Sequence, residues 1–474
     1  MRSNTDMAAY DGPLSIPTLR AAYAHGITPA DVIEAVHDRI EAVRDNPIWI
    51  SRVPRDQALA RARALARSEA SARSPLYGVP FAVKDNIDVS GMETTAACPQ
   101  FAYLARHHAH AVERLEAAGA IVIGKTNLDQ FATGLVGTRS PYGACRNAFD
   151  ARYISGGSSS GSALAVALGQ VAFALGTDTA GSGRIPAAFN NIVGLKPTPG
   201  LVSTCGVVPA CRSLDCVSIF ALDCADALEV LDVVAGFDIE DPFSRRDLPA
   251  RHLAPGNTVA IPRRSQCQFW GDRDYAELYR TGIERCRALG MEVIEVDLAP
   301  FMEAQRMLYE GPWIAERAAA IAPFMDAHPE AVHGAIQITL GAAGAISATE
   351  AFSAFHRLAT LRRETEPLWE RAYCLLLPAA PTIYRVDEIE QRPLELNTRL
   401  GYYSNFVNLL GLAAVNVPGG MRSDGLPFGL SLVGPACSER ALAMLGSRLH
   451  AALAVPAGLG GNPLPAPLAE ETGR

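Results

Sequence analysis

The sequence lacks several patterns that would place it in a common class of protein. Its 10 cysteines include no CxxC pair, so neither a zinc site nor a disulfide framework is indicated. No run reaches the roughly 18 apolar residues that span a bilayer, and the segment ALAVALGQVAFAL is short and interrupted by Gln170. The segment MRSNTDMAAYDG has no apolar stretch of the signal-peptide type. These absences predict a cytoplasmic protein that binds no membrane.

The sequence also lacks an excess of basic residues. Its formal net charge is -8, with the charges spread along the chain, whereas nucleic-acid binding needs a basic face. His107, His108 and His110 lie together in RHHAH, but further ligands for a metal cannot be placed. We therefore predict no nucleic-acid partner, no metal and no cofactor.

One motif that is present does not predict the function usually attached to it. Residues 119–126, GAIVIGKT, satisfy the phosphate-loop pattern GxxxxGK[ST]. A phosphate loop needs flexible residues whose backbone N–H groups can surround a phosphate. The spacer here is Ala-Ile-Val-Ile, which favours a buried strand. Nucleotide binding is not expected at this position.

Helical and strand patterns alternate along the chain. Residues 29–44 predict an amphipathic helix that begins at Pro29 and buries the residues Val32, Ile33, Val36, Ile40 and Val43. Residues 79–83, 120–124 and 171–175 are short apolar runs typical of buried strands, and 111–119 and 161–169 predict helices. With 49% hydrophobic residues, the 474-residue chain can bury a large core. The alternation predicts an α/β fold with a large mixed, mostly parallel sheet covered by helices on both faces.

The domain organisation follows from composition. We expect one domain over residues 1–460, with a possible smaller subdomain within about 236–400, because residues 236–258 are rich in Asp, Arg and Pro. The Gly- and Pro-rich residues 461–474 predict a flexible tail or linker.

Two turns rich in serine and glycine are the strongest candidates for a catalytic site. The first, GGSSSGS, runs directly into a small-residue helix, which a flexible linker does not do. The second, GTDTAGSGRIP, follows a predicted strand and ends near Ser182, and its small residues leave backbone N–H groups free to form an oxyanion hole. A serine needs a base, and the candidate is Lys84, directly after a predicted strand. Taken alone, Lys84 would be an ordinary surface lysine.

The stretches VKDNID, GGSSSGSA and GTDTAGSGRIPAAFNNIVGLKPT resemble the amidase signature family, over residues 15 to 455. The resemblance implies that Lys84 is the base, Ser158 a relay serine held by a cis peptide, and Ser182 the nucleophile. It implies strong burial of Lys84, since the amine must be neutral to act as a base. It also implies that the charged pair Asp178 and Arg184 is structural. The residues implied for the oxyanion hole are Thr179, Ala180, Gly181 and Ser182.

Further stretches are more similar to the amidase domain of allophanate hydrolases: NPIWISRVP, NLDQFATG, VVPACRSLDCVSIFA and LYEGPWIAER. This resemblance implies that Tyr309 and Arg317 bind the substrate, with the backbone near Gly134 as a further contact. Allophanate carries a carboxylate, which the planar guanidinium of an arginine binds in a bidentate manner. The spacing of eight residues puts Tyr309 and Arg317 on similar faces of a helix that Gly311-Pro312 can bend.

The resemblance predicts an enzyme that converts allophanate to N-carboxycarbamate and ammonia through an acyl-enzyme, acting on a small anionic amide as a homodimer. These enzymes commonly have a smaller C-terminal domain that removes carbon dioxide from the first product, and this sequence has a Pro-rich tail instead, so complete hydrolysis by this chain alone is not expected. The alternatives are a hydrolase of carboxybiuret or of general amides, the ammonia-generating subunit of a tRNA-dependent amidotransferase, and an inactive scaffold. An intact set of Lys84, Ser158 and Ser182 argues against the last.

Overall fold

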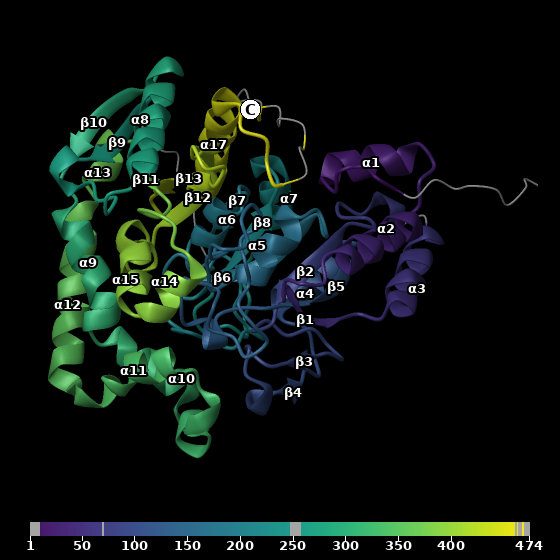
Figure 1. Cartoon of the computed structure of the whole chain (residues 1–474), viewed down its shortest axis with the longest axis horizontal. Coiled ribbons are helices and arrows are strands. Elements are labelled where there is room, and N and C mark those ends of the chain that lie inside the picture. Colours follow the sequence, from purple (N-terminus) through teal and green to yellow (C-terminus); the bar gives the residue numbers. More distant parts are fainter. Residues whose placement is uncertain (1–9, 69–70, 247–256, 460–461, 463–466, 469–474) are drawn as a thin grey trace, which may run out of the picture.

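Eleven strands form one sheet in the computed structural model, which describes residues 10–68, 71–246, 257–459, 462 and 467–468. The sheet runs in the order β1-β5-β2-β6-β8-β7-β12-β13-β11-β9-β10 (Figure 1). Its strands are β1 Trp49–Arg52, β2 Pro80–Lys84, β5 Ile121–Thr126, β6 Phe173–Asp178, β7 Val193–Lys196, β8 Cys216–Ala221, β9 Thr258–Pro262, β10 Glu292–Val296, β11 Cys374–Pro378, β12 Ala413–Met421 and β13 Pro427–Gly434. A separate ribbon pairs β3 Glu93–Thr94 with β4 Tyr103–Leu104.

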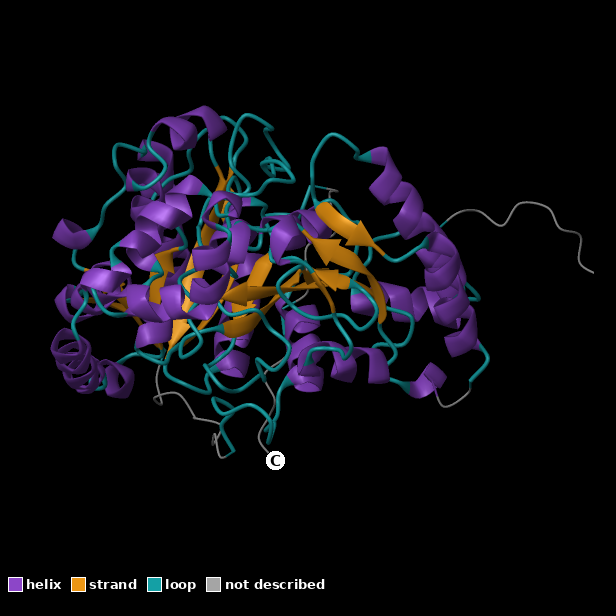
Figure 2. Cartoon of the chain, turned by 90° about the horizontal axis from the view of Figure 1, so that it is seen from below, coloured by secondary structure: helices purple, strands orange, loops and turns teal. Residues whose placement is uncertain are grey.

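Helices cover the sheet on both sides (Figure 2). One row consists of α4, α7, α17 and α8, each packed on the next, while α5 and α6 pack on the sheet and on each other. The helices are α1 Ile16–Ala24, α2 Pro29–Ala42, α3 Arg55–Ala66, α4 His110–Ala117, α5 Ser160–Ala167, α6 Ile185–Phe189, α7 Cys224–Val234, α8 Arg273–Ala288, α9 Ala299–Glu310, α10 Trp313–Ala327, α11 Gly334–Gly341, α12 Ala348–Thr365, α13 Leu368–Arg371, α14 Val386–Gln391, α15 Glu395–Leu400, α16 Phe406–Leu409 and α17 Glu439–Leu453.

The expected mixed sheet covered by helices is confirmed. Its parallel pairs form two blocks, β5-β2-β6 and β11-β9-β10, and the strands between the blocks pair in antiparallel fashion. Parallel pairs are fewer than the alternation suggested, partly because β12 and β13 are joined by the short segment 422–426 as a hairpin. The parallel block β5-β2-β6 matters most here, because strands that run the same way end at the same edge of the sheet.

Most elements expected from the sequence are present with shifted ends. Helix α2 begins at Pro29 with a capping box between Thr28 and Asp31, and it ends at Ala42. Val43 caps this helix and is only partly buried, so the expected helix over 29–44 was two residues too long. Most of the GAIVIGKT segment forms the buried strand β5 rather than a loop, as expected, and its Lys125 pairs with Asp85 at 3.2 Å.

The expected subdomain stays a prediction. Strands from both halves of the chain share the one sheet, and its core includes buried residues from Tyr10 to Ala457. Most of the expected tail, 461–474, lies outside the described residues. Within the described part of the chain no single helix is long and apolar enough to cross a membrane, although the pair 334–345 and 348–371, bent by 101°, meets the length and composition criteria together. The described residues contain no group of three or more metal-ligating side chains.

Candidate active site

Strand β2 delivers Lys84 to the edge of the sheet where β6 also ends. The two strands are parallel, with Val83 opposite Leu175. The residues that follow, Lys84 on β2 and Gly176 to Asp178 on β6, therefore lie toward the same edge of the sheet. Lys84 Nζ lies 2.7 Å from Ser158 Oγ and 2.7 Å from Thr177 Oγ1. Thr177 was not expected at the site from the sequence; its place at the end of a strand parallel to β2 is the signal that could have found it.

The expected burial of Lys84 is confirmed, because its side chain is fully inaccessible to solvent. Burial lowers the pKa of Lys84 to about 7, against the opposing effect of the carboxylates of Asp129, Asp215 and Asp178. An amine in a dry site loses its proton more readily, since the charged form is penalised there. Lys84 can therefore hold or accept a proton near neutral pH, as a general base must.

Ser158 lies in the turn that leads into α5, and its peptide bond with Gly157 is cis. Asp129 fixes this turn, because its backbone N–H donates to the Ser158 carbonyl at 3.0 Å. The Asp129 carboxylate accepts hydrogen bonds from the N–H groups of Val136 and Gly137 at 3.1 and 3.0 Å. A Cβ on Gly157 would lie 2.2 Å from this carboxylate, so only glycine fits there. Asp129 belongs to the stretch NLDQFATG, but its own role was not expected from the sequence.

Ser182 lies in the turn between β6 and α6 and is 3% exposed. No hydrogen bond joins its hydroxyl to another of the described residues. The turn is nevertheless connected to the Ser158 turn, because Ser159 Oγ donates to the Thr177 carbonyl at 3.1 Å. The structure thus brings Lys84 and Ser158 together and places Ser182 in the turn that follows the strand they contact.

A buried ion pair holds the Ser182 turn. Arg184 Nε and Nη2 each lie 2.9 Å from the Asp178 carboxylate. Burial acts to raise the pKa of Asp178, but Arg184 beside it holds that pKa below the ordinary value. The same carboxylate accepts the N–H groups of Gly181 at 2.8 Å and Gly183 at 2.9 Å, so the pair shapes the backbone on both sides of Ser182. This arrangement agrees with the structural role expected for the pair.

The predicted oxyanion donors divide into two groups. Within the described residues, the backbone N–H groups of Thr179, Ala180 and Ser182 have no acceptor, as an oxyanion hole requires. The N–H of Gly181 instead donates to the Asp178 carboxylate at 2.8 Å, so it is not free to serve as the oxyanion donor that was expected. Gly181 has φ +141°, and a Cβ there would lie 2.5 Å from Ser404 Oγ, so glycine is needed for the shape of the turn.

Tyr309 and Arg317 lie on two helices rather than on one. Helix α9 ends at Glu310 and α10 begins at Trp313, because Gly311 and Pro312 interrupt the helical hydrogen bonds. The two side chains still meet, since Arg317 Cζ lies 5.3 Å from the centre of the Tyr309 ring. The expected single helix is therefore wrong, while the expected proximity holds.

Arg317 is a buried cation with free hydrogen-bond donors. It is 2% exposed, and its Nε and Nη1 have no partner among the described residues. Burial acts to lower the pKa of Arg317, but the groups around it, first Tyr309 and then Cys211 and Asp215, raise it above the ordinary value. A charged guanidinium with unused donors in a dry site can bind an anion through charge-assisted hydrogen bonds.

The segment before β8 connects Arg317 to the Ser182 turn. Asp215 accepts hydrogen bonds from the Thr179 hydroxyl and, at 2.8 Å, from the Ala210 N–H. Glu316, the neighbour of Arg317, accepts the Ser213 N–H and the Ser213 hydroxyl, each at 2.7 Å. This segment carries part of the resemblance noted above, but Asp215 itself was not expected from the sequence to act at the site.

Gly134 packs against the Asp129 carboxylate. A Cβ at this position would lie 2.5 Å from Asp129 Oδ2, which explains the glycine without any ligand. Its expected contact with the substrate stays a prediction.

Known proteins resemble this chain over most of its length. A family model described as Amidase matches residues 31–443. Urea amidolyase of Saccharomyces cerevisiae is 44% identical over 422 residues, 88% of this chain but 23% of the yeast protein. A glutamyl-tRNA(Gln) amidotransferase subunit of Symbiobacterium thermophilum is 35% identical, covering 89% of this chain and 93% of the relative.

A solved structure of Kluyveromyces lactis allophanate hydrolase superposes with a TM-score of 0.89 at 39% identity, covering 96% of this chain and 75% of that one. The chain thus spans less than a quarter of the yeast urea amidolyase and three quarters of the allophanate hydrolase chain. Because the family model matches most of its length, this chain belongs to the amidase family.

Proposed function

We propose that the chain hydrolyses allophanate to N-carboxycarbamate and ammonia. Hydrolysis of amides is the reaction of the family to which the chain belongs. The observation that favours allophanate is the buried guanidinium of Arg317, whose unpartnered Nε and Nη1 suit the carboxylate of a small anionic amide. The similarity to allophanate hydrolase of Kluyveromyces lactis supports the same substrate.

In the proposed reaction, Ser182 is the nucleophile. Neutral Lys84 takes a proton from the hydroxyl of Ser158, which takes one from Ser182 as its oxygen bonds to the amide carbonyl carbon. The free N–H groups of Thr179, Ala180 and Ser182 stabilise the resulting oxyanion.

The C–N bond then breaks as the proton returns through Ser158 to the leaving nitrogen, and ammonia departs. Water attacks the acyl-enzyme by the same proton route and releases the acid. The 2.7 Å contact between Lys84 Nζ and Ser158 Oγ supports the first transfer. The pKa of about 7 supports Lys84 as the base.

Substrate selection is proposed to rest on Arg317 and Tyr309. Arg317 would bind the carboxylate, and the Tyr309 ring, 5.3 Å away, keeps the guanidinium in place through a cation–π contact. The link from Glu316 and Asp215 to the Ser182 turn would fix the distance between the carboxylate and the attacked carbonyl.

Ammonia release from allophanate, biuret, malonamate, glutamine and an aryl amide by the purified chain tests the proposal. We expect turnover of allophanate and malonamate to exceed that of glutamine and of the aryl amide. Glutamine hydrolysis that appears only with partner proteins would instead indicate the ammonia-generating subunit of an amidotransferase. One observation favours that alternative: the chain covers 93% of the length of the Symbiobacterium thermophilum amidotransferase subunit.

A homodimer and a cytoplasmic location remain part of the proposal. The dimer is tested by light scattering on the eluted peak of a size-exclusion column at several protein concentrations. A mass near the 50.4 kDa of one chain at every concentration would contradict it.

A further inference from the structure

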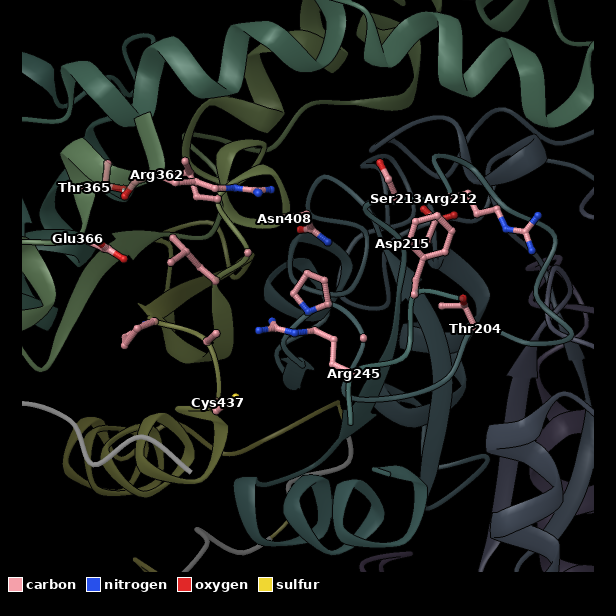
Figure 3. Close-up of a pocket in the computed structure, with 18 of the residues that line it drawn as sticks. Thr204, Arg212, Ser213, Asp215, Arg245, Arg362, Thr365, Glu366, Asn408 and Cys437 are labelled. Atoms are coloured by element: carbon pink, nitrogen blue, oxygen red, sulfur yellow. The ribbon is translucent and has the colours of Figure 1, made fainter. Parts of the chain in front are cut away.

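A second cavity lies outside the proposed catalytic set. It encloses about 600 Å³ between the segment after β7, the segment around 241–245, helix α12 and the residues after α16 (Figure 3). Lys84, Ser158, Ser182 and Arg317 are not among the residues that line it. Asp215 and Asn408 form the wall toward the Ser182 turn, and Asn408 Nδ2 donates to the Asp178 carbonyl at 2.8 Å.

Two arginines direct their charge into this cavity. Figure 3 shows the guanidinium groups of Arg245 and Arg362 pointing into the space from opposite walls, whereas that of Arg212 points away. Arg362 donates to one acceptor, the Leu409 carbonyl, at 3.0 Å from Nε and 2.7 Å from Nη2. Within the part of the chain that the structure describes, neither Arg245 nor Arg362 has a carboxylate partner.

The acidic residues that line the cavity bind groups other than Arg245 and Arg362. Asp241 accepts the Thr204 N–H at 2.6 Å, and Asp215 accepts the Ala210 N–H and the Thr179 hydroxyl. Glu366 pairs with Arg363 at 2.5 Å. Burial lowers the pKa of Arg362, and the nearby charge of Arg245 lowers it further. The two guanidinium groups therefore repel each other, and none of the three carboxylates that line the cavity pairs with either of them in the described part of the chain.

The remaining walls are partly apolar. Trp369, Leu410 and Leu412 line the cavity and are buried, while Phe243 is 41% exposed at its edge. A volume of this size suits a small organic molecule rather than a bare ion. Guanidinium groups bind carboxylates and phosphates through paired charge-assisted hydrogen bonds.

We propose that this cavity binds a small organic anion, with its carboxylate or phosphate between Arg245 and Arg362 and its apolar body against Trp369 and Leu412. Such a ligand would place its negative charge between the two guanidinium groups and fill the apolar part. The site is separate from the proposed substrate site at Arg317.

Isothermal titration calorimetry with phenyl phosphate, benzoate and inorganic phosphate, in about 0.15 M salt, tests the proposal. Phenyl phosphate and benzoate share an apolar ring, so the one that binds more tightly shows whether the site prefers a phosphate or a carboxylate. We expect one of them to bind more tightly than inorganic phosphate. Arg245→Ala should weaken that binding about tenfold or more, because it removes a charge-assisted contact to the anion. The variant is easy to interpret, because the Arg245 side chain makes no hydrogen bond to other described residues.

Arg362→Ala also removes the contact to Leu409, so Arg362→Lys is paired with it: the lysine keeps the charge but not the planar fork and should weaken binding less than the alanine. Arg246→Ala is the matched control. It removes the same charge one residue away, where the guanidinium lies 4.2 Å from the centre of the Phe237 ring, and it should bind as the unmodified chain does.

Arg317→Ala should also leave the affinity unchanged, which distinguishes this site from the proposed substrate site. No binding of either aromatic anion, or equal binding by Arg245→Ala and Arg246→Ala, would overturn the proposal. So would loss of binding in Arg317→Ala alone.

Discussion

Arg317→Ala tests most directly how the proposed site selects its substrate. In the structure Arg317 is 2% exposed, and two of its donors, Nε and Nη1, have no partner among the described residues. A carboxylate bound there would gain two charge-assisted hydrogen bonds in a dry site, each worth about 1.5–3 kcal/mol. The two are not fully additive, so we expect a loss of roughly 2–4 kcal/mol in transition-state stabilisation. That corresponds to about 30- to 1000-fold in kcat/KM for an anionic substrate.

The assay compares kcat/KM for malonamate, an anionic amide, with that for propionamide, a neutral one, by ammonia release. We expect Arg317→Ala to lower the ratio of kcat/KM for malonamate to kcat/KM for propionamide by most of the roughly 30- to 1000-fold factor. Arg317→Lys should recover only part of it, because an ammonium lacks the planar fork. Tyr309→Phe should cost less, since it removes one hydroxyl and keeps the ring.

Arg306→Ala is the matched control for this comparison. It removes an exposed arginine from α9, the helix of Tyr309, and should leave the ratio unchanged. If Arg317→Ala lowers turnover of both substrates equally, Arg317 supports the fold rather than reading the carboxylate. The allophanate proposal would then reduce to an amidase of unknown substrate.

Three further predictions concern the proton route, its pH dependence and the buried ion pair. Lys84→Ala and Ser182→Ala should each remove most activity, and the double variant should lose little more, because groups acting as one unit are not additive; additive losses in steady-state kinetics would contradict the proton route. In the unmodified chain kcat/KM should rise with pH through about 7 and then level off, because burial lowers the pKa of Lys84 to about 7 and only its neutral form is a base; a profile that is flat from pH 5.5 to 8.5 would exclude Lys84 as that base. Asp178→Ala should lower the free energy of unfolding in urea by about 3–5 kcal/mol, because it leaves Arg184 charged and buried without its carboxylate partner. Asp232→Ala, which removes an exposed ion pair, should change it by less than about 1 kcal/mol, and equal effects of the two variants would refute a stabilising role for the buried pair.

Much of the fold could be predicted from local patterns. The apolar runs before Lys84 and Asp178 became β2 and β6, and the small-residue segment after Ser158 became α5. The Ala-Ile-Val-Ile spacer argued against a phosphate loop at residues 119–126, and residues 121–126 form β5. Such patterns are reliable because a run of four to six apolar residues has to be buried in any fold. The pairing of the strands was less predictable, since it depends on which segments meet in space.

The features of the candidate site also divide into those set by local sequence and those set by the tertiary structure. The sequence by itself determined which residues have the right chemistry, since the turns around Ser158 and Ser182 and the position of Lys84 after a strand are local features. The tertiary structure alone decided that Lys84, 74 residues before Ser158, lies 2.7 Å from it. It also decided that Thr177 contacts Lys84, whereas the hydrogen bond from the Gly181 N–H to Asp178 is local to the turn.

The charge states at the site also depended on tertiary structure. Whether Lys84 is neutral, and whether Arg317 has unused donors, depends on which distant segments cover each side chain. Burial penalises a charge because it removes water, and nearby carboxylates oppose that penalty; chain segments far apart in the sequence supply both the cover and the carboxylates here. The helix break at Gly311-Pro312 is visible in the sequence, but the contact between Tyr309 and Arg317 across it is set by how α9 and α10 pack, which no local pattern specifies.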